Sequence, residues 1–280
     1  MRSFTHTTLR KTLIGNNIHS TALRVEHLSP GYGDRTLVRD ISFELAPGEC
    51  VLLAGPNGTG KTTLLKRLAS IPQQIPSSVS DLLGMTKHAH SERSEGIYPP
   101  IILIPTNIPK VKGFTVEGFV ETGCYRESDW KGRIPSEVRG RMEEAIKLLG
   151  IQDLKERDIS TLSDGEFQKA CLATGLTRKA EVLLLDEPTA HLDVENRIDV
   201  LRTLREVARK TGTAILFSSH DLHDALQVAD RVFALTRDGR FLASGPFAQR
   251  RDPDSPVIPS EAKESKLAVL LAAFPNLETL

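Results

Sequence analysis

The sequence contains no long uninterrupted hydrophobic segment. Its longest apolar stretches are six to eight residues, such as 267–274, whereas a helix that spans a bilayer needs about 20. We therefore expect that the chain does not cross a membrane by itself. The stretch 1–21 carries Arg2, Arg10 and Lys11 but lacks the continuous apolar core of a signal peptide, and we expect a disordered arm there.

The sequence is also poor in cysteine and has no excess charge. Its three cysteines, Cys50, Cys124 and Cys171, are far apart, which favours buried, reduced thiols in a reducing compartment. Lys and Arg balance Asp and Glu at 36 each, which argues against nucleic acid or an anionic membrane surface as the main partner. His88 and His90 have no third ligand near them in the sequence, so we expect a solvated loop rather than a metal site.

A glycine-rich loop follows an early apolar run. Residues 55–63 read GPNGTGKTT and stand between the strand-like segment 50–54 and a predicted helix, the context of a phosphate-binding loop. Glycines let consecutive backbone N–H groups turn towards a phosphate chain. Lys61 can reach the β- and γ-phosphates, Thr62 can offer a hydroxyl to Mg²⁺, and the helix N-terminus favours the anion. The loop therefore predicts a nucleoside triphosphate site.

Strand-like and helical patterns alternate along much of the chain. This alternation predicts an α/β fold with a mostly parallel core sheet covered on both faces, preceded by antiparallel strands. The stretch from about 113 to 176 has helical spacing and is predicted to be a helical insertion, whereas 71–100 reads as a surface excursion. The predicted strands are 25–27, 41–45, 51–54, 101–104, 182–185, 214–217 and 232–235, and the predicted helices are 61–68, 116–120, 137–149, 166–176, 195–209 and 263–274.

Two further motifs carry candidate site residues. Asp186 ends a run of four apolar residues and is placed to hold Mg²⁺ through water, and Glu187 follows where a carboxylate can activate an attacking water. In the segment LSDGEFQ, Ser163 is a natural helix N-cap and Gly165 allows close approach of another backbone.

Taken together, these motifs resemble the ATPases of ABC transporters. GPNGTGKTT, LSDGEFQ, LLLDEP, the turn AHLD and the segment SSHD stand in the family's order and spacing, and the resemblance covers about residues 22–250. It implies a P-loop NTPase fold with an N-terminal antiparallel β subdomain and an inserted helical subdomain. The tail 251–280 would carry a short helix outside this unit.

The resemblance also implies roles for individual residues. Asp186 would position Mg²⁺, Glu187 would be the general base, and His220 would contact the γ-phosphate. Tyr32 would stack on adenine, or else it is an ordinary turn tyrosine. The residues implied to surround the phosphates and the metal are Gly55, Pro56, Asn57, Gly58, Thr59, Gly60, Lys61, Thr62 and Thr63.

In this family the working unit is a dimer with two shared ATP sites. The resemblance therefore implies that Ser163 and Gly165 complete the site of a second copy, with Asp193 at the seam between the copies. The sequence departs from the family pattern in two places. Thr106 and Asn107 stand where a glutamine is usual, and Asp164 stands where glycine is common. A carboxylate at position 164 must point away from the γ-phosphate to avoid repulsion.

The resemblance implies an active ATPase that uses ATP and Mg²⁺. With no spanning segment, the chain would be a peripheral subunit on the inner, cytoplasmic face of the cell membrane, beneath separate permease subunits served by a substrate-binding protein. Residues 114–116, 123–126 and Trp130 are similar to the uptake ATPases for iron–siderophore complexes, haem and cobalamin. Two alternatives remain at this stage: a non-transport ABC protein, or a weakly hydrolysing regulatory ATPase that acts as a nucleotide-gated switch.

Overall fold

A computed structural model describes residues 21–32, 35–70, 101–129, 131–244 and 266–274. The predicted arm and the excursion with His88 and His90 lie outside the described residues, as does Trp130. No helix within the described ranges combines the length and the apolar character that a membrane span requires.

A six-stranded sheet forms the centre of the fold. Its strand order is β10-β9-β5-β8-β7-β6; β10 runs antiparallel to β9, and the other neighbours are parallel. The phosphate-loop strand β5 lies between β9 and β8, so the predicted, mostly parallel core sheet is confirmed. The strands are β5 (Cys50–Ala54), β6 (Ile101–Ile104), β7 (Val182–Leu185), β8 (Ala214–Ser218), β9 (Arg231–Leu235) and β10 (Phe241–Ala243).

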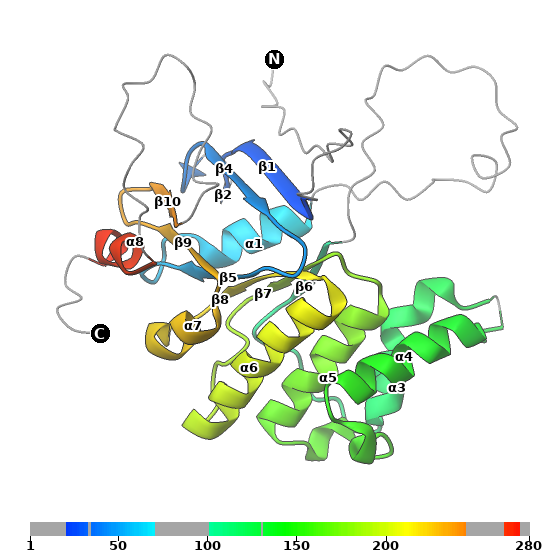
Figure 1. Ribbon diagram of the computed structural model, residues 1–280. Coiled ribbons are helices and arrows are strands. Elements are labelled where there is room, and N and C mark those ends of the chain that lie inside the picture. The colour runs from blue at the N-terminus through cyan, green and yellow to red at the C-terminus, as the bar shows by residue number, and fades with distance from the viewer. Residues whose placement is uncertain (1–20, 33–34, 71–100, 130, 245–265, 275–280) are drawn as a thin grey trace, which may run out of the picture.

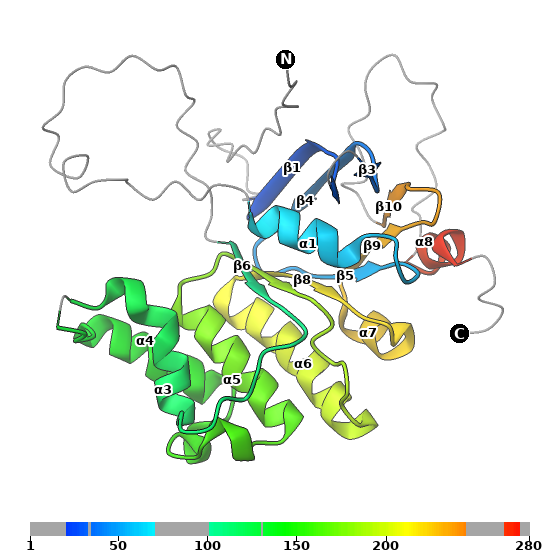
Figure 2. The same ribbon diagram turned by 180° about the vertical axis from the view of Figure 1, so that it is seen from behind.

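Alternate side chains of the core strands enter two separate hydrophobic clusters. In β5, Val51 and Leu53 face α1 (Lys61–Ala69) and the N-terminal strands, whereas Leu52 and Ala54 face the other helices. Figures 1 and 2 show α1 on one side of the sheet and α6 (Val194–Thr211) and α7 (Leu222–Val228) on the other. Because both faces are covered, every residue of β5, β7, β8 and β9 is buried, as expected for a parallel sheet.

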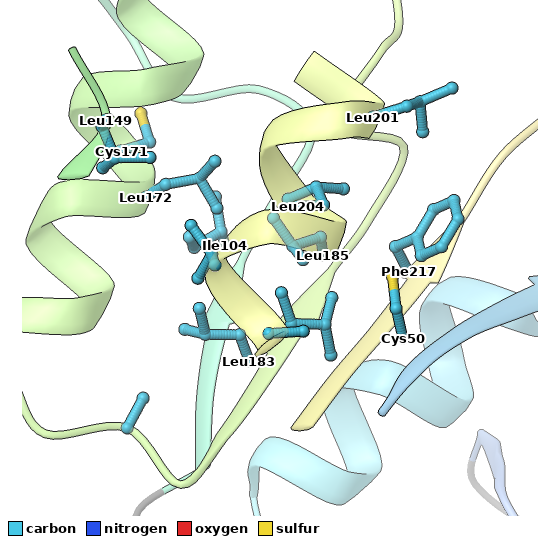
Figure 3. Close-up of a cluster of buried hydrophobic side chains, with 14 of the residues drawn as sticks. Cys50, Ile104, Leu149, Cys171, Leu172, Leu183, Leu185, Leu201, Leu204 and Phe217 are labelled. Atoms are coloured by element: carbon cyan, nitrogen blue, oxygen red, sulfur yellow. The ribbon is translucent and has the colours of Figure 1, made fainter. Parts of the chain in front are cut away.

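A helical layer flanks the sheet within the predicted insertion. Its α5 packs against α3, α4 and α6, and Figure 3 shows Leu172 of α5, Leu204 of α6 and Leu185 of β7 in one apolar cluster. Helix α5 begins two residues before the predicted start because Ser163 caps it. The elements of this layer are α3 (Val116–Glu121), η1 (Thr122–Glu127), α4 (Ser136–Leu148), η2 (Gln152–Leu154), η3 (Ile159–Thr161) and α5 (Asp164–Thr177).

The N-terminal strands pair in antiparallel fashion. β1 (Leu23–Leu28) pairs with β4 (Ile41–Leu45), as predicted, and β2 (Gly31–Tyr32) pairs with β3 (Arg35–Thr36), two short strands that the sequence prediction did not include. The alternating burial of β4 places Ile41, Phe43 and Leu45 in the core, which explains the period of two in its sequence.

Some short elements were not predicted, whereas the C-terminal helix and the buried thiols were. The sequence prediction did not include α7 or β10, because seven and three residues are too short to establish a period. The predicted C-terminal helix is confirmed as α8 (Lys266–Ala273), which packs against β9 and β10 and buries Val269, Leu270 and Ala273. The prediction of buried thiols is confirmed as well, since all three cysteines are buried and free.

Candidate active site

The phosphate loop leaves the carboxyl end of β5 and enters α1. Gly55 has φ 153°, and a Cβ there would lie 2.6 Å from the Leu235 carbonyl oxygen, so only glycine fits. Thr59 closes the loop: its backbone N–H and its hydroxyl both donate to the Pro56 carbonyl, at 3.3 and 2.9 Å. Gly60, at φ 101°, is the N-cap of α1 and brings no side chain over the helix N-terminus, which suits a phosphate group there.

Lys61 folds back into its own loop. Its Nζ donates to the Gly55 carbonyl at 2.8 Å and lies 3.5 Å from the Pro56 carbonyl, and the residue is 6% exposed. Burial lowers the pKa of the Lys61 ammonium, while the nearby Glu187 and Asp186 carboxylates act in the opposite direction. The ammonium is therefore a partly desolvated cation at the point where a triphosphate would place its negative charge.

Asp186 follows β7 and is the centre of a hydroxyl cluster. Its Oδ1 accepts from the Thr62 hydroxyl at 3.1 Å and from the Ser218 hydroxyl at 3.0 Å. Asp186 is 7% exposed. A carboxylate beside hydroxyl oxygens is the hard oxygen donor set that Mg²⁺ prefers, so Thr62 and Asp186 fit this metal.

Glu187 and His220 meet at the same edge of the sheet. Glu187 Oε1 lies 2.6 Å from His220 Nε2, although the two residues follow different strands, β7 and β8. Glu187 has φ 52°, a left-handed conformation that is costly for a residue with a Cβ. Its backbone N–H donates to the Ser218 hydroxyl at 2.8 Å, which holds this conformation.

Thr106, which stands where the family usually has a glutamine, makes a different contact. The Thr106 hydroxyl donates to the backbone carbonyl of Asp186 at 2.7 Å, and the Asp186 N–H donates to the Ile104 carbonyl at 3.0 Å. Thr106 therefore supports Asp186 through the backbone carbonyl of that residue. Asn107 is exposed.

Ser163 and Gly165 form a second, separate group. Ser163 and Glu166 make a reciprocal capping box at the start of α5, with bonds of 3.2 and 2.8 Å. A Cβ at Gly165 would lie 3.1 Å from the Asn196 side chain, and Asn196 in turn bonds to the Asp193 carboxylate through two 2.8 Å contacts. Within the described ranges, no hydrogen bond or ion pair joins Ser163 or Gly165 to the Lys61 loop of the same copy.

The remaining candidate residues are placed by their backbone alone or were not foreseen. Tyr32 lies in β2, where its backbone pairs with Arg35, and the orientation of its side chain is outside the description. Sequence reasoning assigned no role to Ser218, although a polar residue at the end of a fully buried strand was the available signal. It also assigned no role to Arg197, which forms an ion pair with Asp221 beside His220.

Comparisons with known proteins agree with this geometry. Residues 38–190 match the ABC transporter family. The iron(3+)-hydroxamate import ATP-binding protein FhuC of Bacillus subtilis (strain 168) is 32% identical over 233 residues, covering 83% of this chain and 85% of that protein. The zinc import ATP-binding protein ZnuC of Jannaschia sp. (strain CCS1) is 34% identical over 213 residues, covering 76% and 78%.

A solved structure supports the same assignment. The structure of cbiO1 from Clostridium perfringens, part of the ABC transporter complex cbiONQ, superposes with a TM-score of 0.63 at 25% identity and covers 79% of this chain and 87% of that one. The family match, over residues 38–190, spans the loop around Lys61 and the Asp186–Glu187 pair. This chain therefore belongs to the ABC transporter family and is one of its ATP-binding, ATP-hydrolysing proteins.

Proposed function

We propose that this chain is the ATPase subunit of an importer for a metal complex. The cargo that we expect first is an iron–siderophore complex, and haem and cobalamin are the alternatives. The chain would work as a homodimer on the cytoplasmic face of the membrane, beneath separate permease subunits that receive cargo from a substrate-binding protein. The observation that carries the catalytic part is the contact of 2.6 Å between Glu187 and His220, beside the Lys61 loop.

In the proposed reaction, ATP lies along residues 55–63 with its adenine against Tyr32. Thr62 and Asp186 would hold Mg²⁺, which offsets the charge of the phosphates when it is bound. Glu187 accepts a proton from a water molecule that attacks the γ-phosphorus, the bond to the β–γ bridging oxygen breaks, and ADP and phosphate leave. His220, now bonded to Glu187, would turn its Nε2 to the γ-phosphate as the nucleotide enters.

The separation of the two groups of site residues supports the proposal of a second copy. Ser163 is exposed at the start of α5 and bonds within its own capping box. Facing copies would bring Ser163 and Gly165 of one to the γ-phosphate bound by the other, with Asp193 at the seam. Because ATP would bind the closed dimer better than the open one, binding and hydrolysis would drive closure and opening.

Exposed apolar side chains support a membrane partner beside the helical layer. We infer that this layer is a subdomain of residues 113–176 within an ATPase domain of residues 22–250. Val111, Phe114 and Tyr125 are 49%, 45% and 80% exposed and lie on or next to this layer. Cytoplasmic loops of a permease would cover such side chains and receive the motion of the layer. The iron relative and residues 114–116 support the iron cargo, and the zinc relative is the competing assignment to test.

The ATPase is tested by comparing phosphate release from the wild type and Glu187→Gln. We expect release to fall by at least about a hundredfold in the variant, since the general base is lost, and the variant to form a dimer with ATP and Mg²⁺ in size-exclusion chromatography. Equal rates near background would instead support a regulatory switch. For the cargo, cells lacking the gene should lose uptake of radiolabelled iron supplied as a siderophore complex and keep uptake of zinc.

A further inference from the structure

Asp164 is paired with a lysine from a distant segment of the chain. The Lys110 ammonium lies 2.6 Å from Asp164 Oδ1, and the two residues are separated by 54 positions in the sequence. Lys110 also donates to the Leu162 carbonyl at 2.8 Å and lies 5.5 Å from the centre of the Phe167 ring. The Lys110 side chain is 25% exposed, so its charge is held in one place rather than free in solvent.

The anchors of its segment fix the position of Lys110. The segment 105–115 joins β6 to α3, and near its start the Thr106 hydroxyl donates to the Asp186 carbonyl at 2.7 Å. Near its end the Gly113 N–H donates to the Asp158 carboxylate at 2.6 Å. Lys110 therefore reaches the start of α5 from a backbone that is tied on both sides.

Two other charged side chains near the start of α5 are paired with each other and with backbone groups. Glu166 accepts from the Ser163 N–H at 2.8 Å and lies 3.5 Å from Arg157, which itself donates to the Thr161 carbonyl at 2.8 Å. Within the described ranges, Lys110 is the cation that contacts the Asp164 carboxylate. The Asp164 side chain is 59% exposed, and without Lys110 its carboxylate would lose this cationic partner at its position between Ser163 and Gly165.

We propose that Lys110 is a positioning residue for the ATP site of a second copy, acting through Asp164. The inference rests on the proposed function, in which Ser163 and Gly165 meet the γ-phosphate across the dimer. A carboxylate between them would repel that phosphate, since like charges a few ångströms apart interact strongly near a protein surface. Lys110 neutralises the carboxylate and holds it in an ion pair beside the Leu162 carbonyl.

The test is a double-mutant cycle on ATP hydrolysis. We expect Lys110→Met to raise the KM for ATP by about tenfold, which corresponds to about 1.4 kcal/mol, with a smaller effect on kcat because Glu187 and His220 are untouched. In the Asp164→Gly background the same change should alter KM by less than about twofold, because the repelling charge is gone. Lys112→Met, a change of the exposed lysine two residues along, is the matched control and should leave KM unchanged.

The salt dependence of KM gives a readout that a purely structural role of Lys110 would not move. The KM defect of Lys110→Met should shrink at high ionic strength, where the Debye length falls to about 3 Å at roughly 1 M salt. A normal KM in Lys110→Met, or a defect of equal size in the Asp164→Gly background, would overturn the inference and leave the ATPase assignment standing. A wild type that neither hydrolyses ATP nor dimerises with it would overturn the proposed function and this inference together.

Discussion

Ser218 is the residue whose removal tests the geometry of the site most directly. Its hydroxyl donates to Asp186 Oδ1 at 3.0 Å and accepts the Glu187 N–H at 2.8 Å, and the residue is fully buried. Ser218→Ala therefore removes one bond to a carboxylate and leaves the partly buried Glu187 N–H without its acceptor, while adding no bulk.

The magnitude follows from these two losses. A hydrogen bond to a charged group contributes about 1.5–3 kcal/mol net, and a buried donor left unsatisfied costs about 1–3 kcal/mol. Since the two effects share one hydroxyl and the site can relax, we expect Ser218→Ala to lower the free energy of unfolding by about 2–5 kcal/mol. The Glu187 backbone, at φ 52°, loses the bond that holds it in a costly conformation, so its carboxylate should also shift.

The assay combines urea unfolding, followed by circular dichroism, with steady-state ATP hydrolysis. A displacement of Glu187, the proposed general base, by about 1 Å would lower kcat by about a hundredfold, and we expect a fall of that order in Ser218→Ala. Ser244→Ala is the matched control, because the Ser244 hydroxyl is also buried and accepts the Val232 N–H at 2.8 Å, but outside the site. The reasoning is refuted if the two variants lose equal stability and both keep the wild-type kcat.

Three other predictions concern packing, pH and thiol reactivity. In urea unfolding, Gly123→Ala should lower the free energy of unfolding by about 1–3 kcal/mol, because the new Cβ would lie 2.7 Å from the Thr174 carbonyl oxygen. Gly140→Ala in α4 is the control: its Cβ would have no atom within 4 Å, so the change should be neutral or stabilising. The N–H of Ser163 is the main group that lowers the pKa of Glu166 below 4.5, so the stability that Glu166 contributes is present above that pH and lost as the pH falls through the lowered pKa. In urea titrations at successive pH values, the free energy of unfolding of Glu166→Gln should therefore fall less on acidification than that of the wild type. An equal fall in both proteins would contradict this. Burial raises the pKa of the thiols of Cys50, Cys124 and Cys171 to about 12, 11 and 12, respectively. A disulfide reagent at neutral pH should therefore label these thiols only after unfolding, and rapid labelling of the native protein would argue against their packing.

Most of the secondary structure followed from local patterns. The apolar runs 51–54 and 182–185 are buried on both faces of the sheet, and runs of this kind are readable without knowing the partner strand. The ends of elements were less predictable. Helix α6 extends from Val194 to Thr211 rather than over 195–209, because Asp193 caps its start and Gly212 adopts the left-handed conformation after its end.

By itself, the sequence predicted the chemistry of the phosphate loop, since the glycines, Lys61 and Thr62 lie within the single segment 55–63 and their geometry is local. The tertiary structure decided what surrounds that loop. Parallel strands end at one edge of the sheet, which brings His220 to 2.6 Å from Glu187. The same long-range packing places Lys110 on Asp164 across 54 residues, a contact that no local period encodes because it depends on how the segment after β6 crosses the start of α5.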